Sequence, residues 1–133
     1  MIPVCATIHS DFKEGAEVQR KIIDAAIANG FGESQLFGLR IALEEAIVNA
    51  IKHGNKLDRN KHVKINASIS SKQAEIEVED EGPGFDRASV PDPLNEENIE
   101  KFTGRGILMI ESYMTKVSWD RGGRRLKMVK KNG

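Results

Sequence analysis

An acidic and an amide side chain, Glu45 and Asn49, lie four residues apart in a segment whose apolar residues recur at helical spacing. Residues at this separation share one face of a helix, so the carboxylate would lie one turn from the carboxamide. A carboxylate can accept a proton, and an amide oxygen can ligate a hard cation such as Mg²⁺, which also recruits waters and substrate phosphates. An exposed polar pair on a helix is the alternative interpretation, and by spacing alone it is the more common case.

A third polar residue, Asp80, follows a segment in which every second residue is apolar. Because strand side chains alternate between two faces, Asp80 shares the buried face of Val78. A buried carboxylate requires a partner. The bend Gly82-Pro83-Gly84 leaves room for a ligand amine to donate to Asp80. A carboxylate that caps the turn through backbone amides is an equally good interpretation.

The segment Thr103-Gly104-Arg105-Gly106 opens a predicted helix over residues 104–113. Glycines at the start of a helix let backbone N–H groups approach phosphate oxygens, and the helix dipole favours an anion there. Arg105 adds a positive charge. A Gly-x-Gly pattern alone is weak, because glycine before a helix is often only a turn.

The elements that must position these residues follow from the same periodicities. We expect Ser34 to cap a helix over residues 34–53 and Gly54 to end it, with a core stripe of Leu36, Leu39, Leu43, Ile47 and Ala50. Cys5 is expected to be a small core residue of the first strand. The remaining predicted elements are strands near 3–9, 63–70, 74–79, 115–119 and 126–129, and a helix near 12–29.

That order predicts an α/β sandwich, a sheet covered on one face by helices. Between the second and third helical segments, residues 82–103 have no clear period and contain three prolines. An irregular segment of this length in a compact domain is usually a functional lid or is disordered.

Composition limits the classes of function. The chain has 133 residues, so we expect one domain over residues 1–133. Its 20 basic and 20 acidic residues cancel, which gives no overall field toward nucleic acid or a membrane. The single cysteine excludes an internal disulfide, and no apolar run approaches the roughly 18 residues of a membrane span. We therefore expect a cytoplasmic protein with no direct nucleic-acid or membrane contact.

Taken together, the three segments resemble the N, G1 and G2 boxes of the GHKL (Bergerat-fold) ATPase superfamily, which includes gyrase, ninety-kilodalton heat-shock chaperones, histidine kinases and MutL. The run Glu45-Ala-Ile-Val-Asn-Ala-Ile-Lys-His-Gly-Asn55 is especially similar to the RsbW-type anti-sigma factors, which are serine/threonine protein kinases. The resemblance extends from about residue 11 to about residue 130. It implies a two-layer α/β sandwich with a mixed, mainly antiparallel sheet and helices on one face.

The resemblance also implies roles for single residues. Asp80 would accept a hydrogen bond from the adenine amino group, and Gly82 and Gly84 would shape the turn beside the base and begin an ATP lid over about 82–103. Asn49 would ligate Mg²⁺, and Glu45 would be the general base. The remaining nucleotide-binding positions would be Thr103, Gly104, Arg105, Gly106 and Ile107.

His53 matches a family position as well, although packing at the end of the helix explains this histidine equally. Relatives are commonly dimers, so a homodimer is implied. The apolar residues Ile23 and Ile27 of the first helix could form such an interface or pack into the core.

The implied function is that of an ATP-binding anti-sigma regulatory factor. With Mg²⁺, it would phosphorylate a serine or threonine of an anti-sigma-factor antagonist (a STAS-type protein), and a sigma factor would be its other partner. The alternative is a non-catalytic GHKL module that senses nucleotide or sequesters a partner. A histidine kinase is a weaker alternative, because these enzymes carry their phosphoacceptor histidine on a separate helical domain.

Overall fold

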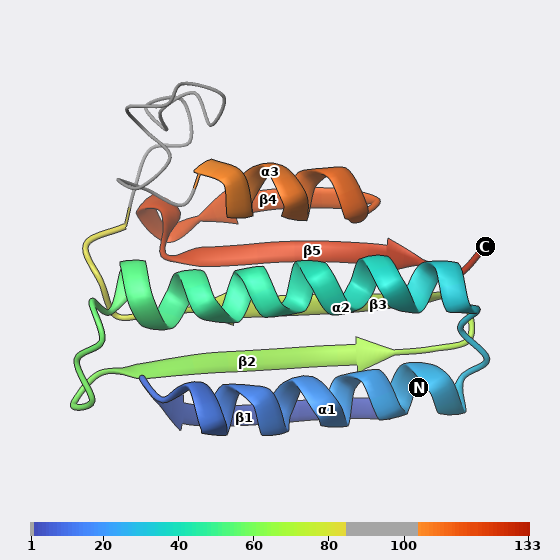
Figure 1. The fold of residues 1–133 in the computed structure, drawn as a ribbon, viewed down its shortest axis with the longest axis horizontal. Coiled ribbons are helices and arrows are strands. Elements are labelled where there is room, and N and C mark those ends of the chain that lie inside the picture. The colour runs from blue at the N-terminus through green and yellow to red at the C-terminus, as the bar shows by residue number, and fades with distance from the viewer. Residues whose placement is uncertain (1, 85–103) are drawn as a thin grey trace.

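Alternating apolar residues build an antiparallel sheet in the computed structural model, which describes residues 2–84 and 104–133. Within these residues the strands pair in the order β1-β2-β3-β5-β4, and every pairing is antiparallel (Figure 1). The first and last strands along the chain therefore lie in one continuous sheet. The strands are β1 (Ile2–His9), β2 (His62–Ile69), β3 (Gln73–Glu79), β4 (Lys116–Asp120) and β5 (Arg125–Lys131).

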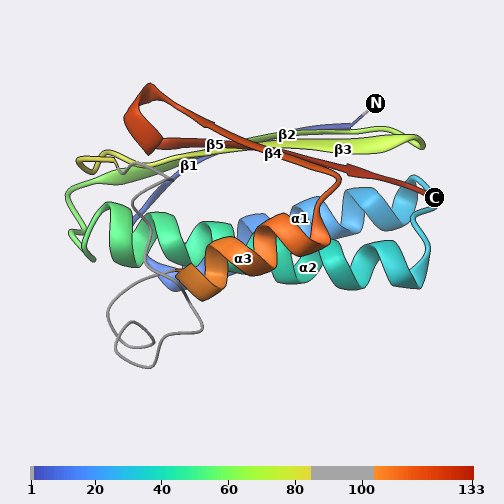
Figure 2. The same cartoon turned by 90° about the horizontal axis from the view of Figure 1, so that it is seen from above.

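The described helices cover one face of this sheet, and none of them lies on the other face (Figure 2). They are α1 (Phe12–Ala28), α2 (Glu33–Val48) and α3 (Gly104–Tyr113), and a π-helical turn, η1 (Asn49–Gly54), continues directly from α2. The predicted two-layer α/β sandwich is confirmed. None of the described helices is long and apolar enough to cross a bilayer.

The start of α2 differs from the prediction. The Asp11 carboxylate caps α1 by accepting hydrogen bonds from the backbone N–H groups of Lys13 and Glu14. By contrast, α2 begins one residue before Ser34, and its N-cap is Gly32, whose carbonyl accepts from Leu36 N–H at 2.9 Å. The prediction that Ser34 is the N-cap is therefore wrong: Ser34 is an exposed residue within the first turn.

The core lies between the sheet and the helices, and the predicted period-two pattern holds in it. β2 buries Val63, Ile65, Ala67 and Ile69, and β3 buries Ala74, Ile76 and Val78. Of the predicted helical stripe, four residues are buried, and Leu36 is partly buried against the core. The predicted 34–53 helix thus buries the expected face, although its last turn is π-helical.

Two predictions about single residues need correction or completion. Cys5 is exposed, not part of the core. The reason is strand phase: Ile8 and Ala6 of β1 face the helices, so Cys5 faces the open side of the sheet. In α1, Ile23 packs into the core at 5% exposure, whereas Ile27 is 51% exposed.

Candidate functional site

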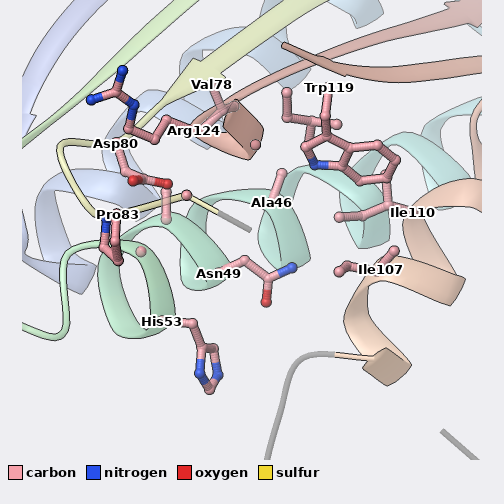
Figure 3. A pocket seen from close by; sticks show the side chains of 15 residues that line it. Ala46, Asn49, His53, Val78, Asp80, Pro83, Ile107, Ile110, Trp119 and Arg124 are labelled. Atoms are coloured by element: carbon pink, nitrogen blue, oxygen red, sulfur yellow. The ribbon is translucent and has the colours of Figure 1, made fainter. Parts of the chain in front are cut away.

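A pocket opens where α2, η1 and α3 meet one end of the sheet (Figure 3). It encloses about 620 Å³ of space, including the part that is open to solvent. Sites for small molecules and cofactors typically span about 300–1,000 Å³ and combine apolar walls with a few polar groups. The polar residues that line this pocket are Asn49, His53, Asp80 and Arg124.

Asp80 is the first residue after β3, and its side chain continues the buried phase of that strand. Its backbone N–H donates to the carbonyl of Arg124 at 3.0 Å, and its Oδ1 accepts from Gly82 N–H at 2.8 Å. Burial raises the pKa of Asp80 above its usual value, and the Gly82 hydrogen bond and the Arg124 charge only partly offset this effect. The carboxylate therefore caps the turn and also lines the pocket.

Two glycines allow the chain to close around Asp80. A Cβ atom built at Gly54 would lie 2.3 Å from Asp80 Oδ2, and one built at Gly82 would lie 1.9 Å from the carbonyl oxygen of Gly54. Any side chain at either position would separate η1 from the end of β3. Sequence reasoning gave Gly54 only the role of a helix stop, because this contact joins segments that are distant in the chain.

Glu45 and Asn49 lie where α2 meets the start of α3. A Cβ atom built at Gly106 would lie 2.6 Å from Glu45 Oε2 and 3.2 Å from Asn49 Oδ1, so a side chain at this position would displace the Glu45 carboxylate or the start of α3. Desolvation raises the pKa of Glu45, and the neighbouring charge of Glu44 raises it further. The structure therefore brings together the predicted pair and one glycine of the third segment.

The far wall of the pocket comes from the β4–β5 turn, which sequence reasoning did not include. Gly84 has a φ of +81°, and a Cβ atom there would lie 2.0 Å from the carbonyl oxygen of Gly122. The bend after β3 thus lies directly against this turn. Trp119 of β4 and Arg124, the residue before β5, line the pocket beside it.

Apolar side chains complete the pocket wall. Val78 could have been predicted as a lining residue from the sequence, because it precedes Asp80 on the same face of the strand. No sequence pattern predicts Trp119 as a lining residue, since only the pairing of β4 with β5 brings its side chain to the pocket. The other apolar lining residues include Ala46, Ile107, Ile110 and Leu126.

The remaining predicted site residues differ in where the structure places them. His53 lines the pocket, and burial, with a smaller contribution from Lys52, lowers its pKa. The backbone places Gly104 and Arg105 in the first turn of α3. Thr103 lies outside the described residues, as does the predicted lid beyond residue 84.

The site has no protein cage for a metal ion: in residues 2–84 and 104–133, no group of three or more His, Cys, Asp or Glu side chains could hold one. This donor set still fits Mg²⁺. Magnesium usually keeps several waters and is bound by one or two protein oxygens together with substrate phosphates. The Asn49 amide oxygen, beside the start of α3, is a donor of this kind.

Comparison with known proteins places the chain in a family. Residues 10–130 match the histidine kinase-like ATPase domain. The chain belongs to this family. The resemblance drawn from the N, G1 and G2 boxes is thereby confirmed, and the pocket is the candidate nucleotide site of a histidine kinase-like ATPase domain.

Curated relatives of this histidine kinase-like ATPase domain point to the RsbW-type subgroup. An anti-sigma F factor of Clostridium perfringens is 35% identical over 83 residues, which is 60% of this chain and 59% of that protein. The serine-protein kinase RsbW of Bacillus subtilis is 29% identical over 94 residues, covering 66% of this chain and 59% of that protein. The chain thus spans about three fifths of the length of these relatives.

A solved structure shares the fold. The crystal structure of the RsbU and RsbW domains of Rv1364c from Mycobacterium tuberculosis matches with a TM-score of 0.65 and 14% identity. The match covers 99% of this chain and 32% of that one. At this identity the match supports the two-layer architecture alone.

Proposed function

We propose that this chain is an anti-sigma regulatory factor that binds Mg-ATP and phosphorylates a serine or threonine of an anti-sigma-factor antagonist. The observation that carries the proposal is the contact of Gly106 with Glu45 and Asn49, beside the pocket that contains Asp80. This contact joins a proton acceptor, an oxygen ligand and a helix start at one place. The similarity to proteins named anti-sigma F factor and serine-protein kinase RsbW gives the class of reaction.

The pocket suggests one orientation for the nucleotide. Asp80 lies at one end, Ile107 of α3 at the other, and Asn49 between them (Figure 3). The adenine amino group would donate to Asp80, in the turn shaped by Gly82 and Gly84. The phosphates would then lie toward the first turn of α3, where backbone N–H groups and the helix dipole favour anions. Arg105 and Thr103 would complete this end of the site.

Phosphoryl transfer depends on positioning and charge more than on covalent chemistry. The hydroxyl oxygen of the acceptor would attack the γ-phosphorus of ATP. The bond from this phosphorus to its bridging oxygen would break, and ADP would leave with the bonding electrons. Glu45 would take the hydroxyl proton, and Asn49 would hold Mg²⁺. Mg²⁺, when bound, neutralises charge on the phosphate oxygens.

The same proposal gives partners and location. A STAS-type antagonist would be the substrate, a sigma factor would be the second partner, and the chain would act in the cytoplasm as one domain over residues 1–133. A homodimer is compatible with the exposed Ile27 of α1.

The test is phosphoryl transfer from ATP labelled at the γ-phosphate to a purified STAS-type antagonist. We expect an acid-stable label on the antagonist, dependent on Mg²⁺ and lost in an Asp80→Asn variant. An antagonist that binds the ATP-loaded protein and stays unlabelled would contradict the kinase proposal.

One observation favours a second candidate, a non-catalytic module that senses nucleotide and sequesters a partner. Asn49 lines the pocket, but Glu45 does not; it is packed against the position of Gly106. A Glu45→Ala variant that retains full partner regulation in cells would favour this candidate over the kinase.

A further inference from the structure

Asn55, the residue that follows η1, is the most deeply buried polar side chain in the described part of the protein, with 0% of its surface exposed. Its Nδ2 donates to Ser10 Oγ at 3.0 Å and to the carbonyl oxygen of His62 at 2.9 Å. Its Oδ1 accepts from the backbone N–H of Glu81 at 2.7 Å. Both amide hydrogens and the carbonyl oxygen are therefore used.

The chemistry of these partners fixes the orientation of the amide. The Glu81 N–H can only donate, and the His62 carbonyl can only accept, so exchanging the oxygen and nitrogen of Asn55 would break both bonds. A carboxylate or an apolar residue of the same shape could not make the same set. Position 55 therefore requires a group that accepts on one side and donates on the other.

The bond to Glu81 connects Asn55 to the candidate nucleotide site. Glu81 lies between Asp80 and Gly82, which are joined by the Oδ1 hydrogen bond of 2.8 Å. On one side of this turn, Asp80 N–H donates to the carbonyl of Arg124; on the other, Glu81 N–H donates to Asn55. Two adjacent backbone amides are thus held by two different parts of the fold.

The residue before Asn55 reinforces this link. Gly54 leaves room for the Asp80 carboxylate, and its carbonyl lies against Gly82, at 1.9 Å from where a Cβ atom would be. Displacement of Asn55 would move Gly54 as well, and both contacts end on the turn that carries Asp80. A preorganised acceptor of this kind strengthens recognition because little ordering remains to be done on binding.

We propose that Asn55 is a positioning residue for adenine recognition: it holds the Asp80–Gly82 turn so that the Asp80 carboxylate is placed for the amino group of ATP. The inference rests on the proposed nucleotide site. In this proposal Asn55 does not contact the nucleotide and acts only through the turn that carries Asp80. It differs from a purely structural role, in which the amide would only join Ser10, His62 and Glu81 to stabilise the fold.

The two roles are separated by two ligands, ATP and purine riboside triphosphate, which lacks the 6-amino group. Both are titrated as magnesium complexes into the full chain and into Asn55→Ala and Ser10→Ala variants. Ser10→Ala is the matched control, because it removes one bond of the same buried amide and leaves the bond to Glu81 in place. Thermal unfolding of each variant records the loss of stability.

We expect the parent to prefer ATP and Asn55→Ala to lose about tenfold of its ATP affinity, while its affinity for the analogue changes less than about threefold. Ser10→Ala should keep the preference despite its lower stability. An Asn55→Ala variant that keeps the preference for ATP, or weakens both ligands equally, overturns the inference. A folded parent that binds neither ligand contradicts the proposed function instead.

If Asn55→Ala does not fold, amide hydrogen exchange in the parent answers the same question. The Glu81 amide lies outside a strand but has a fully buried acceptor, so it should exchange as slowly as core strand amides. Binding of ATP, more than of the analogue, should slow the Glu81 and Gly82 amides further. Exchange of Glu81 at the rate of an open loop overturns the inference.

Discussion

The α-carbon of Gly106 faces the carboxylate of Glu45 so closely that a methyl group there would lie 2.6 Å from Oε2. Real Cβ atoms do not approach an oxygen to this distance, so either α3 or the Glu45 side chain would have to move. The same methyl group would lie 3.2–3.3 Å from the amide atoms of Asn49. The absence of a side chain at Gly106 thus allows the Glu45 carboxylate, the Asn49 amide and the start of α3 to lie together at the candidate site.

The first prediction concerns Gly106→Ala. Alanine favours a helix over glycine by about 1 kcal/mol, which offsets part of the cost of moving the displaced groups, so the melting temperature should change little. Affinity for Mg-ATP should nevertheless fall by about tenfold or more, because the methyl group displaces Glu45, Asn49 or the start of α3. Calorimetric titration and thermal unfolding measure the two effects. Ser112→Ala is the control: it also raises helix propensity in α3, on an exposed side, and should leave binding unchanged.

The second prediction concerns Glu45 as general base. Glu45→Gln preserves the shape of the side chain, so Mg-ATP should bind within about threefold of the parent, while phosphoryl transfer should fall about 10²–10⁴-fold. Single-turnover transfer of labelled phosphate measures the step. Loss of binding and transfer to the same extent would show that Glu45 acts in binding alone.

The pH dependence of transfer gives an independent check on Glu45. Burial raises the pKa of Glu45 above 4.5, and the base must be deprotonated to act. Activity should therefore fall with acid at a pH above that of an ordinary glutamate. Glu44→Gln removes the second cause of the shift, so it should lower the pKa of Glu45, move the acid limb to lower pH and leave the plateau unchanged. An acid limb at the same pH in the parent and in Glu44→Gln would contradict the assignment of Glu45 as the general base.

Local periodicity predicted much of the fold and part of the site. Alternation in β3 gave the orientation of Asp80, because every strand residue fixes the face of the next. The separation of Glu45 and Asn49 predicted that they share a face, because residues four apart lie one turn from each other on a helix. In both cases a single element contains the whole signal.

The rest of the site depends on contacts between elements, which local patterns do not contain. Arg124 reaches Asp80 only because β5 pairs with β3 in the register that places Glu79 opposite Arg125. The prediction for Cys5 is wrong because only one face of the edge strand β1 is covered by helices, and Cys5 lies on the opposite face from the buried Ile8. Which strands pair, and which face of the sheet the helices cover, depend on tertiary contacts, so the sequence of one segment does not contain this information.

The third prediction concerns Gly54→Ala. Its φ is not positive, so alanine fits the backbone, but the new methyl group would lie 2.3–2.8 Å from all three atoms of the Asp80 carboxylate group. We expect the Asp80 turn to shift and Mg-ATP affinity to fall about tenfold or more. The matched control is Gly32→Ala, whose methyl group meets only the flexible end of Gln35. Equal affinities of the two variants would show that the Gly54 contact has no role in the site.

The fourth prediction separates binding from stability at Asp80. In Asp80→Asn the amide oxygen can still accept from Gly82 N–H, but the NH₂ group then faces the adenine amino group, donor against donor. Mg-ATP affinity should fall by about 1.5–3 kcal/mol, or roughly tenfold to a hundredfold. Glu79→Gln, a change in the neighbouring carboxylate on the other side of β3, should leave affinity unchanged.

The same Asp80→Asn substitution that lowers Mg-ATP affinity should leave the folding stability unchanged or raise it. Burial raises the pKa of Asp80 in the folded protein above its usual 3.8, so the folded state binds the proton more tightly than the unfolded chain. At pH 7 the charged carboxylate opposes folding, and Asp80→Asn should be at least as stable as the parent. This advantage should be full above the raised pKa and should vanish as the pH falls through it toward 3.8. Denaturant unfolding of both proteins across this range measures the difference. A variant that is less stable at pH 7, with the deficit shrinking in acid, would mean that the Asp80 charge already has a stabilising partner within the protein.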